Sequence, residues 1–494
     1  MDPKSESQSV AAPPAHRGQR SQPARSARPA ATTLAALRAS DHKHVTVKQE
    51  IRQNLLARLR AGEDAFPGII GFGQTVLPQL ERSLLAGHDV ILLGERGQGK
   101  TRLIRTLTGL LDEWTPTISG CEINDHPYAP VCARCQRLAA ADGDALPVSW
   151  RHRSDRYGEK LATPDTSVGD LIGDIDPVKV AEGRTLGDPE TIHFGLVPRT
   201  NRGVFCLNEL PDLAERIQVA LLNVLEERDI GVRGYALRLP LDLVLVASAN
   251  PEDYTNRGRI ITPLKDRFGA EIRTHYPTSL AAELALIRQE SQLAWDGEEP
   301  GAVLPAHLVQ VIARFTRLVR ASPAIDARSG VSARFAIAAA ESVAASAVRR
   351  AAISGEAQPV ARVCDLPAIV SSLRGKVEFE VSEEGREQEV LEHLLRRAIA
   401  ETFRATLGSA DLAGVLVKFE EGGSVESGEL IPAPDLLRRI GEVPGLAKIM
   451  ERLGMDGGES LGEAAAALEF TLEGLYLMRR LSKDTVDGGA VYRT

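Results

Sequence analysis

The chain has 494 residues, of which 43% are hydrophobic and 4% aromatic, and its formal net charge is −8 at pH 7. This length predicts two or three globular units, and the composition favours a helix-rich α/β architecture over an all-β sandwich. The negative charge argues against a dedicated nucleic-acid binder, and five cysteines are too few for a secreted disulfide scaffold. Because no apolar run could span a bilayer and no apolar signal region is present, we expect a cytoplasmic protein without membrane contact.

The first half of the chain predicts a tail followed by a parallel sheet. Residues 1–44 are rich in Ala, Pro and Arg, and we expect them to form a disordered tail because they hold too little apolar surface to form a core. Residues 45–276 are expected to form an α/β domain. Buried strands are predicted at 89–93, 203–207 and 243–248, and helical spacing of apolar residues at 45–60, 77–85 and 217–227. Strands that alternate with helices predict a parallel sheet flanked by helices on both faces.

The second half of the chain changes to a helical pattern. Residues 277–375, with Ala-rich stretches at 305–320 and 332–350, are expected to form a separate helical lid. Residues 376–494 are charged, and their apolar stripes predict a mainly helical C-terminal extension. The pattern of this extension does not indicate a function.

The strongest motif is a phosphate-binding loop that directly follows the first predicted strand. It fits the pattern G-x-x-x-x-G-K-[ST] with Gly94, Glu95, Arg96, Gly97, Gln98, Gly99, Lys100 and Thr101. Glycines let successive backbone N–H groups turn inward around phosphate oxygens, where bulkier residues would block the approach. Lys100 is expected to reach the β- and γ-phosphates of ATP, and the Thr101 hydroxyl is expected to contact Mg²⁺.

Polar residues end the next two predicted strands. Asn208 and Glu209 follow the second strand and Asn250 follows the third, and the ends of parallel strands form the ligand crevice. We assign Glu209 as the base that orients and deprotonates the attacking water, and Asn250 as a residue that holds this water or the γ-phosphate. Asn208 is expected to back the metal, although Asp is usual at this position and Asn brings no charge.

These elements in this order resemble the AAA+ ATPases. In detail the chain resembles the ATPase (I-type) subunit of magnesium chelatase and its bacterial relatives over residues 64–275, and more weakly to about residue 350. The matching passages are residues 66–71, 94–101, 194–197, 201–203, 248–251 and 264–269. The fold that the resemblance implies is a P-loop AAA+ sheet with a helical lid.

The resemblance also implies a homo-oligomer, usually a hexameric ring, with ATP bound at the subunit interfaces. Arg267 would then be an arginine finger, with Arg257 and Arg259 as weaker alternatives. Arg334 would be the sensor arginine of the lid, with Arg328 as runner-up. Loop insertions are placed at 167–197 and 229–239, and the partner implied is a protein with a von Willebrand factor A-type domain. The motor is implied, whereas the metal insertion itself is not.

A cluster of metal-binding residue types follows the phosphate loop. Cys121, His126, Cys132 and Cys135 lie within fifteen residues and include one C-x-x-C pair. Such a set could form a Cys₃His zinc site, although only one half has the usual tight spacing. The alternative is a loop with free cytosolic thiols.

Three functions remain open on the sequence. The first is an ATP-driven subunit that remodels a partner protein. The second is a transcription activator of the alternative-sigma-factor type, which the helix at 217–228 resembles, although the Gly-Ala-Phe-Thr-Gly-Ala loop and a helix-turn-helix are not found. The third is an ATP-binding switch with little turnover, which Asn208 suggests.

Overall fold

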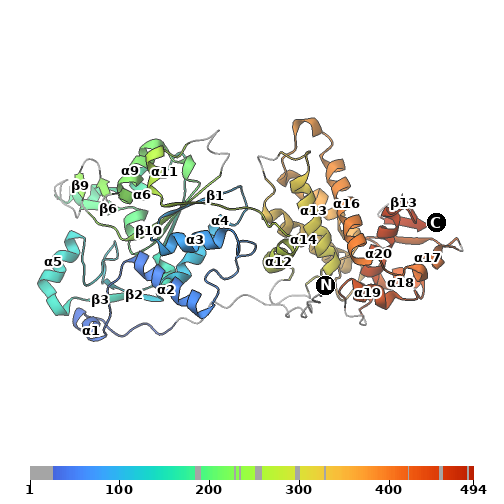
Figure 1. Cartoon of the computed structure of the whole chain (residues 1–494), viewed down its shortest axis with the longest axis horizontal. Coiled ribbons are helices and arrows are strands. Elements are labelled where there is room, and N and C mark those ends of the chain that lie inside the picture. Colours follow the sequence, from blue (N-terminus) through green and yellow to red (C-terminus); the bar gives the residue numbers. More distant parts are fainter. Residues whose placement is uncertain are drawn as a thin grey trace, which may run out of the picture.

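The computed structural model describes residues 26–183, 191–226, 230–232, 235–237, 239–250, 259–294, 301–326, 330–420, 422–455, 460–486 and 489–493. Figure 1 shows two bodies, an α/β unit on the left and a helical unit on the right, which carries the C-terminus. Within the described residues, no helix is both long and apolar enough to cross a membrane.

A five-stranded parallel sheet forms the centre of the α/β unit. Its order is β11 (Ala270–Arg273), β1 (Val90–Leu93), β10 (Leu243–Ala249), β7 (Gly203–Asn208) and β4 (Tyr157–Leu161). Each neighbouring pair is parallel, so all five carboxyl ends lie at one edge. The predicted P-loop AAA+ parallel sheet is confirmed, and the three strands predicted from apolar runs are its three central strands.

Alternate residues of the strands divide between two hydrophobic cores. Val90 and Leu92 contribute to the core under α2 (Val47–Ala61), α3 (Val76–Leu85) and α4 (Lys100–Thr106). Ile91 and Leu93 contribute to the core under α9 (Glu215–Glu226) and α11 (Thr262–Arg267). Side chains of a strand point to opposite faces in turn, so a sheet covered on both faces needs apolar residues at every position.

Three antiparallel pairs leave the central sheet. β2 (Trp114–Ile118) pairs with β3 (Val148–His152), and α5 (Ala133–Asp142) lies between them in sequence. β5 (Gly173–Ile175) pairs with β6 (Ile192–Phe194), with α6 (Val168–Leu171), α7 (Pro177–Ala181) and α8 (Leu196–Arg199) close by in sequence. β8 (Ile230–Val232) pairs with β9 (Tyr235–Leu237). The last two pairs fall within the predicted insertions at 167–197 and 229–239, parts of which lie outside the described residues.

The N-terminal segment differs from the disordered tail predicted for residues 1–44. Residues 1–25 lie outside the described part, but α1 (Leu34–Ala39) is a capped helix with Leu34 and Leu37 buried. Leu34 donates a backbone hydrogen bond to Leu146, and the Trp150 indole donates to the Ala31 carbonyl. The composition of residues 1–44 could not predict these contacts, because the apolar surface that α1 covers belongs to a distant part of the chain.

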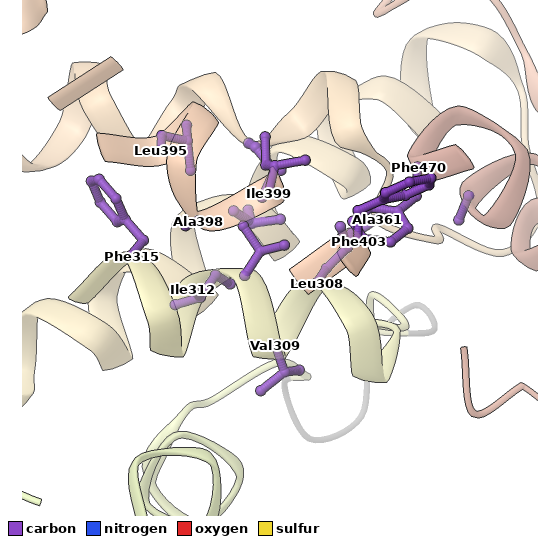
Figure 2. Packing of buried hydrophobic residues seen from close by; sticks show 14 of the residues in the cluster. Leu308, Val309, Ile312, Phe315, Ala361, Leu395, Ala398, Ile399, Phe403 and Phe470 are labelled. Carbon is purple, nitrogen blue, oxygen red and sulfur yellow. The ribbon is translucent and has the colours of Figure 1, made fainter. Parts of the chain in front are cut away.

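The helical unit has one continuous core across the boundary predicted at residues 375 and 376. It contains α12 (Leu280–Glu290), α13 (Ala306–Ala321), α14 (Ala333–Ser354), α15 (Pro367–Leu373), α16 (Glu387–Leu407), α17 (Ala413–Glu420), α18 (Ala433–Ile440), α19 (Leu446–Arg452) and α20 (Leu461–Leu477). In Figure 2, Ile312 and Phe315 of α13 lie opposite Leu395 and Ala398 of α16. Gly474 of α20 lies against the Phe403 ring, where a Cβ atom would collide.

A small antiparallel sheet closes the helical unit. Its order is β12 (Val425–Gly428), β14 (Gly489–Arg493) and β13 (Ser482–Val486). The sequence predicts a mainly helical extension here, whereas the chain after α20 forms β13 and β14. Four of the five residues of β13 are polar, so its sequence pattern resembles that of a loop.

Candidate functional site

The phosphate-binding loop connects β1 to α4 at the carboxyl edge of the sheet. Gly97 and Gly99 have φ values of 72° and 79°, which lie in the left-handed region that favours glycine. A Cβ atom on Gly97 would collide with Ser332, whereas one on Gly99 would meet no protein atom within 4 Å. The loop is therefore packed against the helical unit at Gly97 and open at Gly99, where α4 begins.

Lys100 connects this loop to the end of the central strand β10. Its side chain is buried, and its ammonium donates to the Gly94 carbonyl, to the Glu95 carbonyl at 3.0 Å and to Asn250 Oδ1 at 2.8 Å. A buried ammonium group needs acceptors or anions around it. The residues fit a polyphosphate, because the buried ammonium lies beside a glycine-containing loop whose backbone N–H groups can surround phosphate oxygens.

Thr101 and Asn208 lie in hydrogen-bond contact at the start of α4 and the end of β7. The Thr101 hydroxyl donates to Asn208 Oδ1 at 3.3 Å, and the Ser248 hydroxyl donates to the same oxygen at 3.1 Å. Asn208 is buried at the end of β7. The two oxygens of Thr101 and Asn208 are hard ligands of the kind that Mg²⁺ prefers, directly or through water. They therefore fit the proposed metal position.

Glu159 of β4 is a site residue that the sequence analysis missed. Its Oε1 accepts a hydrogen bond from Asn208 Nδ2 at 2.7 Å, and Arg105 and Tyr157 also donate to its carboxylate. An ionised carboxylate only accepts, so Glu159 holds the amide nitrogen of Asn208 and turns Oδ1 toward Thr101. The negative charge missing from position 208 is thus present one strand away.

Glu209 and Asn250 form the second half of the site. Asn250 Nδ2 donates to Glu209 Oε2 at 3.0 Å, so Asn250 joins the carboxylate to the ammonium of Lys100. The backbone of Glu209 has φ 54° and ψ 50°, a left-handed conformation that costs a non-glycine residue about 1 kcal/mol. Such strain in a turn directly after a core strand is typical of functional positions.

The start of α14 touches the phosphate loop. The Ala333 N–H donates to the Gly97 carbonyl at 3.3 Å, and the Tyr276 hydroxyl donates to the Arg96 carbonyl at 2.8 Å. Arg334 is exposed in the first turn of α14, next to this contact. The remaining loop residue, Gln98, accepts from the Thr274 hydroxyl at 2.7 Å. The helical unit is thus in direct contact with the loop.

The predicted arginine finger lies on the surface. Arg267 is exposed at the end of α11 and donates to Asp266 at 3.3 Å. Arg259 is also exposed, whereas Arg257 and Arg328 lie outside the described residues. The role of Arg267 stays a prediction, because it concerns a neighbouring subunit.

Three of the four predicted zinc ligands gather where the loop after β2 meets the first turn of α5. The sulfurs of Cys121, Cys132 and Cys135 lie within 4.8 Å of one another and of a carboxylate oxygen of Asp125. His126 is not part of this group. Its Nδ1 accepts from the Tyr128 N–H at 3.0 Å, and its Nε2 lies 3.2 Å from His42 Nε2. The structure therefore differs from the sequence prediction in the fourth residue, Asp125 in place of His126.

Sequence reasoning gave no signal for Glu159 or Asp125. Glu159 lies in the polar edge strand β4, whose five residues show no apolar run. Asp125 lies directly before His126 in the sequence. Because histidine is the commoner metal ligand beside a C-x-x-C pair, the sequence pattern favours His126 over Asp125. Only strand order and loop geometry bring the two acids to their sites.

The fold and the arrangement of the site are of the P-loop AAA+ type. The features that define this type are the phosphate loop, a polar residue at the end of each of the next two central strands, and a helical unit in contact with the loop. No protein-family profile matches the chain.

Comparison with known proteins finds sequence relatives among the subunits of magnesium chelatase. The chain is 28% identical to the magnesium-chelatase subunit ChlI of Anabaena variabilis over 211 residues, which cover 41% of this chain and 57% of that protein. It is 30% identical to ChlI of Guillardia theta over 206 residues, covering 41% and 55%. The chain thus spans about half the length of the curated relatives it matches. Both relatives are magnesium-chelatase subunits, as the resemblance of the sequence indicates.

Solved structures give a weaker likeness. A complex of the magnesium-chelatase subunits BchI and BchD, obtained by cryo-electron microscopy, is 19% identical and covers 66% of this chain and 98% of that chain, with a TM-score of 0.33.

Proposed function

We propose that this chain is an ATP-hydrolysing motor subunit that assembles into a ring and remodels a partner protein. The observation that carries the proposal is one hydrogen-bonded network at the carboxyl edge of the sheet. It joins Lys100 through Asn250 to the carboxylate of Glu209, and Thr101 meets Asn208 beside it. Phosphate donors, a metal position and a carboxylate base are the parts that phosphoryl transfer to water requires.

Each residue has a role in this proposal. The loop 94–99 and Lys100 bind the phosphates of ATP, and Thr101 and Asn208 hold Mg²⁺ directly or through water. Glu209 takes the proton of the attacking water, and Asn250 positions this water molecule. Bound Mg²⁺ supplies positive charge that lowers the repulsion between the phosphates and the water. Arg334, in the first turn of α14, senses the γ-phosphate and passes its loss to the helical unit.

The relatives support the choice of a motor over a transcription activator, because their names describe chelatase subunits. A cytoplasmic ring, a hexamer in its commonest form, would place Arg267 of one subunit at the ATP of the next. The partner proposed is a protein with a von Willebrand factor A-type domain.

The experiment that tests the function is steady-state ATP hydrolysis by the purified chain with Mg²⁺. Binding without turnover would favour the switch that Asn208 suggests.

Arg267 can be tested by mixing two inactive variants. Lys100→Ala and Arg267→Ala are each expected to lose ATP hydrolysis, since one lacks the phosphate contact and the other the finger. In a mixed ring, a Lys100→Ala subunit supplies Arg267 to the intact loop of an Arg267→Ala neighbour. Random mixing restores this pairing at about a quarter of the interfaces, so a comparable share of activity should return. A mixture as inactive as its components would contradict the shared site.

Glu159 provides a test of the metal position. Glu159→Ala is expected to raise the Mg²⁺ concentration for half-maximal ATP hydrolysis about 10-fold, because residues that orient metal ligands typically contribute that much. The control is Arg105→Ala, which removes an exposed partner of the same carboxylate and should leave the requirement nearly unchanged. An unaltered Mg²⁺ requirement in Glu159→Ala would show that Asn208 does not depend on this carboxylate.

A further inference from the structure

The loop between β2 and α5 has the construction of a closed metal site, outside the nucleotide site. A carboxylate oxygen of Asp125 and the sulfurs of Cys121, Cys132 and Cys135 lie within 4.8 Å of one another. Four ligands around a tetrahedral zinc ion, with Zn–S bonds of about 2.3 Å, lie about 3.8 Å apart. The group therefore needs only a small contraction to surround one ion.

Asp125 gives an independent indication of a cation. Its side chain is fully buried, and its Oδ2 accepts from the N–H groups of Val131 at 2.9 Å and Cys132 at 2.8 Å. Its Oδ1 is buried and has no hydrogen-bond partner among the described residues. A buried carboxylate oxygen without a partner is unfavourable, and a metal ion would satisfy it.

Two of the sulfurs also accept hydrogen bonds from backbone N–H groups. The Asp125 N–H donates to Cys121 Sγ at 3.3 Å, and the Cys135 N–H donates to Cys132 Sγ at 3.4 Å. Donors of this kind stabilise thiolates, and the thiolate is the form of cysteine that binds metals.

We propose that Cys121, Asp125, Cys132 and Cys135 bind one structural Zn²⁺ ion. Thiolates and a carboxylate are both zinc ligands, and four protein ligands leave no open position for catalysis. The ion would link the end of β2 to the start of α5, in a loop with few apolar residues of its own. His126 is outside this ligand set, because its ring nitrogens face His42 and the Tyr128 N–H.

The experiment measures metal in the untagged full-length chain, purified without chelators and dialysed after addition of Zn²⁺. Elemental analysis should find about one zinc ion per chain in the wild type. Cys135→Ser should hold less than about a tenth of that amount, because a lost thiolate weakens the whole site. His126→Gln and the matched thiol control Cys364→Ser should keep the wild-type content. A wild type without zinc, or zinc loss in His126→Gln equal to that in Cys135→Ser, would overturn the proposal.

The fourth ligand is tested separately, in a variant of nearly the same shape. Asp125→Asn should release zinc to a competing chelator at about 10-fold lower chelator concentration than the wild type, since it removes a negative ligand. In the Co²⁺-loaded protein, the visible bands of a tetrahedral site should change between the wild type and Asp125→Asn and not in His126→Gln. Identical spectra and zinc affinities in Asp125→Asn and wild type would exclude this ligand.

A measurement on the wild type covers the case in which the cysteine variants do not fold. Removal of zinc by a chelator should abolish hydrogen-exchange protection in residues 119–136, and added Zn²⁺ should restore it. Mass spectrometry of the unreduced, alkylated protein should find no disulfide among these three cysteines. A disulfide there, or protection indifferent to the chelator, would overturn the proposal. None of these measurements depends on ATP hydrolysis.

Discussion

Replacement of Lys100 by Ala is expected to weaken ATP binding about 100-fold or more. The variant loses the charge-assisted contacts to the β- and γ-phosphates, each worth about 1.5–3 kcal/mol. It also removes the ammonium that donates to Asn250 Oδ1 at 2.8 Å, which weakens the positioning of Asn250 beside Glu209. Both effects act in the same direction, and hydrolysis should be lost together with binding.

The measurement for Lys100→Ala is the Kd of ATP from calorimetry or from a fluorescent analogue. Lys448→Ala is a suitable control, because it removes the same charge from an exposed position in α19 of the helical unit. A thermal melt should show that both variants are folded. Wild-type affinity in Lys100→Ala would refute the phosphate-loop assignment and the proposed function with it.

Replacement of Glu209 by Gln is expected to lower the rate of ATP hydrolysis by about 10²–10⁴-fold and to leave ATP binding intact. Gln keeps a carbonyl oxygen that can accept the hydrogen bond from Asn250, so the side chain should stay in place. What the variant loses is the ability to take a proton from the attacking water. The loss should therefore be in kcat, with the Kd of ATP close to that of the wild type.

Two comparisons make the Glu209 result specific. Glu215→Gln removes a carboxylate from an exposed position at the start of α9 and should hydrolyse ATP at the wild-type rate. Glu209→Gly should relieve the left-handed backbone strain of about 1 kcal/mol and keep the melting temperature, yet be as inactive as Glu209→Gln. Equal turnover in wild type and Glu209→Gln would show that another group is the base.

Much of the nucleotide site could be predicted because its signals are local. The phosphate loop is a run of eight residues, and Asn208, Glu209 and Asn250 end apolar strands that are legible one by one. The structure brings these residues into one hydrogen-bonded network. Their chemical roles stay predictions until the variants are measured.

Long-range partners could not be predicted from the same patterns. Glu159 and Asn208 are 49 positions apart and meet because β4 and β7 are neighbours in the sheet. The segment around α1 looked disordered because its composition holds too little apolar surface, whereas Leu34 completes a core built by other segments. The boundary predicted at residue 375 failed to mark a change of core for a similar reason, since α13 and α16 pack together across it.

The sequence by itself determined where the glycine-containing loop turns after the first strand and which strands are buried on both faces. These properties depend on glycine conformation and on contiguous apolar residues, both of which act over a few positions. Only the tertiary structure decided that Asp125 and not His126 joins the three cysteines, and that Glu159 faces the Asn208 amide. Such pairings depend on strand order and loop geometry, which result from packing of the whole chain and leave no mark in local spacing.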